Sequence, residues 1–120
     1  MHEFSVCQDL LRQVEDLVRA HNARTVSAIH LQIGPLSGIE ASLLEQAFTV
    51  ARAGTVAATA MLMTQALPIR VRCQSCGASS VAAPNRLICG TCGDWHTELL
   101  SGDELLLASV ELELEEDDDV

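Results

Sequence analysis

CQSCGASSVAAPNRLICGTCG, residues 73–93, contains four of the five cysteines as two Cys-x-x-Cys pairs with twelve residues between them. Two residues between paired cysteines allow a tight turn to aim both sulfur atoms at one point. Gly77 and Gly93, each directly after the second cysteine of its pair, supply the positive φ that such turns need. Four thiolates around one centre suit tetrahedral Zn²⁺ and leave no open coordination position. The spacing therefore predicts a structural zinc site formed by Cys73, Cys76, Cys89 and Cys92.

Other chemistries use the same residue types, and the spacing leaves one of them open. An iron–sulfur cluster is also held by four thiolates, so the ligand spacing alone does not decide the metal. A thioredoxin-like redox pair is disfavoured because neither pair opens a helix after a strand. Disulfides are disfavoured in the reducing cytoplasm, where we expect this protein. Because residues 77–88 have little apolar content, this lobe depends on metal, and structural zinc contributes about 10–16 kcal/mol.

Before the cysteines, hydrophobic periodicity predicts two helices and a strand. Residues 5–21 carry apolar side chains at the i, i+3, i+4, i+7 spacing of an amphipathic helix. Residues 25–33 alternate apolar and polar side chains, which is typical of a strand with one wet face. Ser37 followed three residues later by Glu40 fits a capping box, which predicts a second helix over residues 39–53.

Extended structure flanks the cysteine module on both sides. Residues 59–71 predict a strand with an edge position or a bend at Pro68. Residues 97–100 and 104–114, joined by the Ser101-Gly102 turn, predict a hairpin. The predicted fold class is α+β, with two helices packed on a small mixed β-sheet and an inserted zinc-ribbon lobe.

The same pattern predicts three regions. The first is an α/β domain made of residues 1–70 and 98–114, and the second is a zinc-ribbon domain at 71–97. Residues 115–120 form an acidic tail that is expected to be disordered, because a run of like charges repels itself.

The composition excludes several classes of function. Seven Arg and no Lys stand against seventeen Asp and Glu, which gives a net charge of -10. This charge repels phosphate backbones, which supply most of the affinity for nucleic acid, and it also repels anionic membranes. Divalent cations and basic protein surfaces suit it better. No Ser-His-Asp order, paired carboxylates, P-loop or dinucleotide fingerprint is present, so we expect no enzymatic activity.

Targeting signals are not apparent in the sequence. The N-terminus has no basic region followed by an apolar stretch, so no signal peptide is predicted. The longest apolar run, residues 56–63, is interrupted by Thr59 and is too short to span a bilayer. We therefore expect a cytoplasmic protein that does not associate with membranes.

The N-terminus offers a second metal-binding motif. In Met1-His2-Glu3 the imidazole lies one peptide from the α-amine, so amine, amide nitrogen and imidazole can close consecutive chelate rings. Ni²⁺ and Cu²⁺ favour planar nitrogen sites, and the bound metal drives amide deprotonation. Taken alone, this motif carries less weight than the interpretation of His2 as an exposed terminal histidine.

Five segments, taken together, change that balance. They are Met1-His2-Glu3, IGPLSGIE at 33–40, Phe48 to Gly54-Thr55, the two cysteine pairs, and Gly102-Asp103-Glu104-Leu105. In order and spacing they resemble the HypA/HybF family of hydrogenase-maturation nickel chaperones. The resemblance extends over residues 1–114.

This resemblance implies an accessory protein that delivers Ni(II) to the large subunit of [NiFe]-hydrogenase together with a HypB-type GTPase. Relatives also serve urease maturation proteins, so the recipient enzyme stays open. The resemblance implies nickel binding in the α/β domain by His2 and Glu3, through the imidazole and adjacent backbone nitrogens. It implies Zn(II) binding by the four cysteines. It leaves Glu40 and His96 open as further ligands, against their interpretation as a capping-box residue and a surface histidine beside Trp95.

The alternative function is a zinc-ribbon nucleic-acid or transcription accessory module. Basic residues near the ribbon would favour it, and the sequence supplies only Arg70, Arg72 and Arg86 there. Three single residues receive structural interpretations. Cys7 lies on the buried helical face as a small core residue, His21 contacts the C-terminal carbonyls of its helix, and His30 is solvated on a strand.

Overall fold

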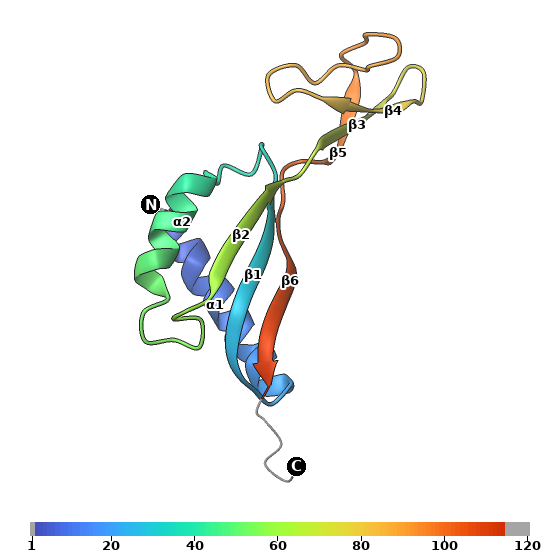
Figure 1. Ribbon diagram of the computed structural model, residues 1–120. Coiled ribbons are helices and arrows are strands. Elements are labelled where there is room, and N and C mark those ends of the chain that lie inside the picture. Colours follow the sequence, from blue (N-terminus) through green and yellow to red (C-terminus); the bar gives the residue numbers. More distant parts are fainter. Residues whose placement is uncertain (1, 115–120) are drawn as a thin grey trace. The chain divides into compact units, whose positions relative to one another are not determined.

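The computed structural model describes residues 2–114, and the predicted tail at 115–120 lies outside the described residues. It confirms the predicted fold class of two helices with small sheets (Figure 1). Neither described helix is long and apolar enough to cross a membrane. The elements are, in chain order, α1 (His2–Ala20), β1 (Ala23–Ile33), α2 (Ala41–Ala51), β2 (Met61–Ala66), β3 (Ile69–Cys73), β4 (Ser79–Ala82), β5 (Thr97–Ser101) and β6 (Leu105–Leu114).

The first predicted helix is present, but α1 begins at His2 rather than near Ser5. Glu3 lies in its first turn, where the positive end of the helix dipole favours a carboxylate. Asn22, with a φ of 51°, follows the last turn in the left-handed conformation and ends the helix. The apolar face is buried as the periodicity indicates, and its buried residues are Cys7, Leu10, Leu11, Val14 and Val18.

The second predicted helix is also present, but the predicted capping box is wrong. The helix begins after Glu40, whose backbone is extended and whose side chain makes no capping hydrogen bond. The Ser37 hydroxyl accepts the Ile39 N–H at 3.2 Å, so it closes a local turn before the helix instead of capping it. The Glu40 N–H is directed at the Glu3 carboxylate of α1 at 3.5 Å. A contact with another helix therefore replaces the local cap.

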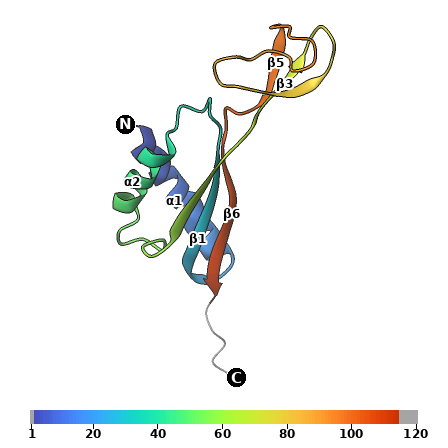
Figure 2. The same ribbon diagram turned by 45° about the horizontal axis from the view of Figure 1, so that its top comes forward.

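The helices cover a mixed three-stranded sheet with the strand order β2-β1-β6. In Figure 1, β1 and β2 run in the same direction and β6 returns in the opposite one. Figures 1 and 2 show α1 crossing one face of this sheet with α2 beside it. The buried side chains of β1 meet those of the helices in a core that is largely aliphatic. Its members on β1 and α2 include Val26, Ala28, Ile29, Leu31, Leu44 and Phe48.

The second sheet has the order β4-β3-β5, and both neighbours pair with β3 in antiparallel register. Buried and exposed residues alternate along β3, so one face of this sheet is covered and the other is open. Arg70 and Arg72 point to the open face, whereas Ile69, Val71 and Cys73 are buried. Because β3 ends at Cys73, the strand places the first cysteine of the first pair on its buried side.

The predicted hairpin between residues 97–100 and 104–114 is wrong, because β5 pairs with β3 whereas β6 lies beside β1. The cause is a close backbone approach at Gly102, which has a φ of 118°. A Cβ on Gly102 would lie 2.8 Å from Ile69 Cγ1, and a Cβ on Gly34 would lie 2.2 Å from the Gly102 carbonyl oxygen. The chain therefore leaves one sheet and enters the other at Gly102 instead of folding back on itself.

The chain forms two compact units. Of the described residues, one unit contains 2–31, 40–64 and 107–114, and the other contains 32–39 and 65–106. Both helices belong to the first unit, and all four paired cysteines belong to the second. The predicted bend at Pro68 is present, since β2 ends at Ala66 and β3 begins at Ile69. The predicted domain boundaries, with a zinc-ribbon domain at 71–97, remain a prediction.

Candidate metal centres

The four paired cysteines converge on one point. Their sulfur atoms all lie within 4.8 Å of one another. The Sγ atoms of Cys73 and Cys92 are 3.6 Å apart, and those of Cys76 and Cys89 are also 3.6 Å apart. Four sulfurs at the zinc–sulfur distance of about 2.3 Å around a tetrahedral centre stand about 3.8 Å from each other. The spacing and the soft donor set therefore fit Zn²⁺.

Each cysteine pair forms a knuckle that folds its own backbone over a sulfur. Cys73 Sγ accepts the N–H groups of Ser75 and Cys76, each at 3.3 Å. Cys89 Sγ accepts those of Thr91 and Cys92, at 3.3 and 3.4 Å. The two knuckles thus repeat one geometry. The glycines that follow them adopt the positive φ predicted from the sequence, 78° at Gly77 and 79° at Gly93.

These N–H groups also prepare the thiols for metal. The N–H of Cys92, followed by that of Thr91, lowers the pKa of the Cys89 thiol to about 6. The N–H of Cys76 likewise lowers the pKa of the Cys73 thiol. The thiolate is the form that binds metal. Each knuckle therefore presents one sulfur whose deprotonated form is favoured by its own turn.

Asp94 joins the two knuckles, a role that the sequence analysis missed. The Ser75 hydroxyl of the first knuckle donates to Asp94 Oδ2. Asp94 Oδ1 accepts the His96 N–H at 3.1 Å and lies 2.8 Å from His96 Nδ1. The Asp94 carbonyl also accepts the Cys89 N–H at 2.8 Å. The Ser75 hydroxyl, followed by the His96 ring, lowers the pKa of the Asp94 carboxyl, so the residue stays an anionic acceptor between the knuckles.

We expect Asp94→Ala to weaken zinc binding by roughly 10- to 100-fold, because outer-shell partners that orient ligands typically carry that much affinity. Ser75→Ala should move affinity in the same direction, and Asp94→Asn should retain part of it by accepting the same hydroxyl. Zinc competition against a chromophoric chelator measures this. Glu98→Ala, an exposed acid on β5, is the control. Wild-type zinc affinity in Asp94→Ala would show that the knuckles hold together without this residue.

The structure places His96 in the zinc-binding unit as an exposed side chain. Its ring stacks on Trp95 with a centroid distance of 3.8 Å and an interplanar angle of 28°. Together with the Asp94 contact, this stack holds the imidazole on two sides. These contacts match the interpretation of His96 as a surface histidine beside Trp95.

His2 and Glu3 occupy the first turn of α1, and the two side chains behave differently. The His2 side chain is 63% exposed, whereas the Glu3 side chain is only 9% exposed. His2 Nε2 lies 3.8 Å from Glu3 Oε2. Glu40, a possible further nickel ligand, contacts the Glu3 carboxylate through its backbone N–H, and its own side chain is exposed. The turn therefore gathers one imidazole, one buried carboxylate and several backbone N–H groups.

The remaining single-residue interpretations are mostly confirmed. Cys7 is fully buried, and burial raises the pKa of its thiol, as suits a core residue. His21 Nδ1 lies 2.9 Å from the Leu17 carbonyl oxygen at the end of α1, as predicted. His30 differs from the prediction, because its Nε2 lies 2.7 Å from a Glu111 carboxylate oxygen instead of facing only water. Pairing between β1 and β6 brings these two side chains together.

A four-sulfur centre of this geometry is typical of a small metal-binding protein. Residues 1–112 match the family model described as HypA, hydrogenase/urease nickel incorporation, metallochaperone. The hydrogenase maturation factor HypA of Nitrosospira multiformis is 45% identical over 93% of this chain and 97% of its own. That of Aquifex aeolicus is 40% identical over 96% of this chain and 100% of its own.

Solved structures give the same result for the fold. A solution structure of a HypA protein matches with a TM-score of 0.74 at 26% identity, covering 96% of this chain and 98% of that one. The solution structure of the nickel metallochaperone HypA from Helicobacter pylori matches with a TM-score of 0.70 at 24% identity, covering 96% and 100%. The chain belongs to the HypA family of nickel-incorporation metallochaperones. Membership of a metallochaperone family is consistent with the expectation that the chain is not an enzyme.

Proposed function

We propose that this chain binds Ni(II) at its N-terminus through His2 and Glu3 and delivers it to the large subunit of [NiFe]-hydrogenase. It acts in the cytoplasm with a HypB-type GTPase, and urease maturation proteins are further candidate partners. Zn(II) held by Cys73, Cys76, Cys89 and Cys92 has a structural role. The family match over residues 1–112 carries this proposal.

The start of α1 supports the placement of nickel. The first four N–H groups of a helix have no acceptor within the helix, so a metal that displaces these protons breaks no helical hydrogen bond. The positive end of the helix dipole also stabilises a deprotonated amide nitrogen. Because α1 begins at His2, the amides beside the His2 imidazole belong to this turn. Imidazole and amide nitrogens together make the planar nitrogen site that Ni²⁺ favours.

The four-sulfur centre suits a resident metal rather than the cargo. Four cysteine ligands close a tetrahedral site and leave no position open for a transfer partner. Two of the four, Cys73 and Cys89, are almost completely buried. A transferred ion needs ligands that exchange readily, and the exposed His2 side chain meets this need better. In this proposal the four-cysteine site holds a structural metal, and the N-terminal site holds the metal that is transferred.

Two tagged forms of the protein test whether the α-amine beside His2 completes the proposed nickel site. A tag before Met1 converts the α-amine to an amide and displaces it, whereas a tag after Val120 leaves the N-terminus unchanged. Loss of an outer-shell partner typically lowers metal affinity by roughly 10- to 100-fold, and loss of a direct donor should lower it at least as much. Nickel should therefore bind the N-terminally tagged form more weakly. Calorimetry gives the affinities. Metal analysis should find one zinc in both forms, and iron in place of zinc would contradict the structural-zinc assignment. Equal nickel affinities would remove the α-amine from the ligand set.

A further inference from the structure

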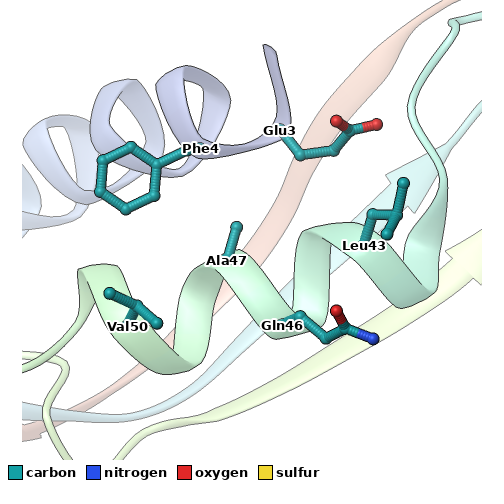
Figure 3. Close-up of a pocket in the computed structure, with 6 residues that line it drawn as sticks. All are labelled: Glu3, Phe4, Leu43, Gln46, Ala47 and Val50. Carbon is teal, nitrogen blue, oxygen red and sulfur yellow. The ribbon is translucent and has the colours of Figure 1, made fainter. Parts of the chain in front are cut away.

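A groove lies between the first turn of α1 and the outer side of α2, with a volume of about 270 Å³. Figure 3 shows the Phe4 ring and the Ala47 methyl group facing each other across it, with the Glu3 carboxylate toward one end. Most of its lining is apolar and solvent-accessible: Phe4 is 37%, Leu43 40% and Val50 67% exposed. The six lining residues are Glu3, Phe4, Leu43, Gln46, Ala47 and Val50.

The dimensions of this α1–α2 groove indicate the kind of molecule that it accepts. Pockets for small ligands are usually about 300–1,000 Å³ and enclose most of the ligand. The α1–α2 groove is smaller, and its walls are exposed side chains. Contiguous exposed apolar residues bordered by polar ones are typical of surfaces that bind protein. The groove therefore suits one or two side chains of a partner better than a cofactor.

Glu3 sets the chemistry at one end of the groove. Its side chain is more than nine-tenths buried, yet its carboxylate contacts with the described residues are long, 3.5 Å to the Glu40 N–H and 3.8 Å to His2 Nε2. Hydrogen bonds to carboxylates are normally shorter, about 2.7–2.9 Å. A buried carboxylate held by contacts of this length has acceptor capacity for a stronger donor. The groove thus combines an apolar wall with an anion at its end.

Two arginines on or just after these helices are engaged elsewhere. Arg52, just after α2, donates to the Ala60 carbonyl at 2.7 Å and lies over the Phe48 ring. Arg12 on α1 pairs with Asp9. Among the described residues, these two arginines therefore do not neutralise Glu3, and the net charge of -10 attracts a basic surface of another molecule.

We propose that the α1–α2 groove docks a segment of a protein partner that carries a large apolar side chain next to a lysine or arginine, whose cation pairs with Glu3. The apolar side chain covers Phe4, Leu43 and Val50. Docking then acts on nickel, a consequence that rests on the proposed N-terminal site. Glu3 stabilises a divalent cation at the adjacent His2 by its negative charge, and a partner cation at Glu3 cancels this effect. Docking therefore lowers nickel affinity, and by linkage nickel lowers docking affinity by the same factor.

Docking is tested first without nickel, on zinc-loaded protein labelled with ¹⁵N. Three capped peptides serve as probes: one alternating Lys and Leu, one alternating Glu and Leu, and one alternating Lys and Ser. We expect only the Lys/Leu peptide to shift amide signals of the residues lining the groove. Binding of the Lys/Ser peptide with equal affinity would indicate charge attraction alone, and it would overturn the proposal. Shifts spread over the whole protein, or an absence of shifts, would overturn it as well.

Variants locate the docking site. Val50→Glu replaces the most exposed large apolar residue of the lining and should weaken Lys/Leu binding by about tenfold or more, because it puts a charge against the apolar part of the probe. Glu3→Gln should weaken binding of the same probe by removing its ion-pair partner. Glu45→Gln, which removes an exposed charge from the same helix outside the lining, should leave binding unchanged. Thermal unfolding checks that every variant is folded. An affinity for the probe that is unchanged by both Val50→Glu and Glu3→Gln would exclude the groove.

The nickel consequence is measured separately. The Lys/Leu peptide at saturation should lower nickel affinity by about fivefold or more, within the usual range of coupling between sites. In Glu3→Gln the peptide should change nickel affinity much less. An unchanged nickel affinity in wild type at peptide saturation would overturn the coupling. If nickel binds elsewhere, His2→Ala will show it, and docking in the nickel-free protein stands or falls independently.

Discussion

Replacing Cys89 by serine is expected to abolish stoichiometric zinc binding and to unfold the segment between the knuckles. Cys89 is almost fully buried, and its sulfur accepts two N–H groups of its own knuckle. Structural zinc contributes about 10–16 kcal/mol, which exceeds what the few apolar side chains of residues 77–88 can supply. The helical unit has a separate aliphatic core on α1, α2 and β1, so its secondary structure should survive.

Hydrogen exchange with metal analysis checks this result. Protection should be lost across residues 73–101 while the amides of α1 remain protected. Cys7→Ala is the matched control, because it removes the one cysteine outside the cluster and should leave zinc at one equivalent. A Cys89→Ser protein that retains stoichiometric zinc and full protection would refute the four-cysteine site.

Replacing His2 by alanine is expected to abolish tight nickel binding and to leave the fold and the zinc content unchanged. His2 contributes the imidazole that chelates together with its own backbone, and its side chain is largely exposed, so the loss creates no cavity. His30→Ala is the control, since the His30 imidazole pairs with Glu111 on the neighbouring strand β6. Calorimetry should show weak or no nickel binding in His2→Ala and wild-type binding in His30→Ala.

The same pair of variants tests delivery. In cells that lack the native maturation factor, wild type and His30→Ala should restore [NiFe]-hydrogenase activity, whereas His2→Ala should not. Nickel bound by His2→Ala as tightly as by wild type would show that the N-terminal site is wrong. If His2→Ala loses nickel binding as expected but still restores full hydrogenase activity, nickel binding at His2 is not required for delivery.

The sequence alone was sufficient wherever the physical cause is local. The geometry of a cysteine knuckle depends on four or five consecutive residues, so the positive φ of Gly77 and Gly93 could be predicted. The buried face of α1 follows from helical periodicity, and four of its members are branched aliphatic residues at the predicted positions. The His21 contact with Leu17 lies one turn apart on the same helix. The family resemblance also needed only the order and spacing of short segments.

Tertiary structure decided every feature that depends on residues far apart in the chain. The hairpin prediction failed because strand partners are chosen by the close approach of Gly102 to Ile69 and Gly34, which no linear pattern records. The capping box failed because Glu3, 37 residues away, lies opposite the Glu40 N–H. Asp94 joins two knuckles through a hydroxyl 19 positions earlier. In each case a long-range contact outweighs a local preference, because local preferences are worth only about 1 kcal/mol and packing against a distant segment can exceed that.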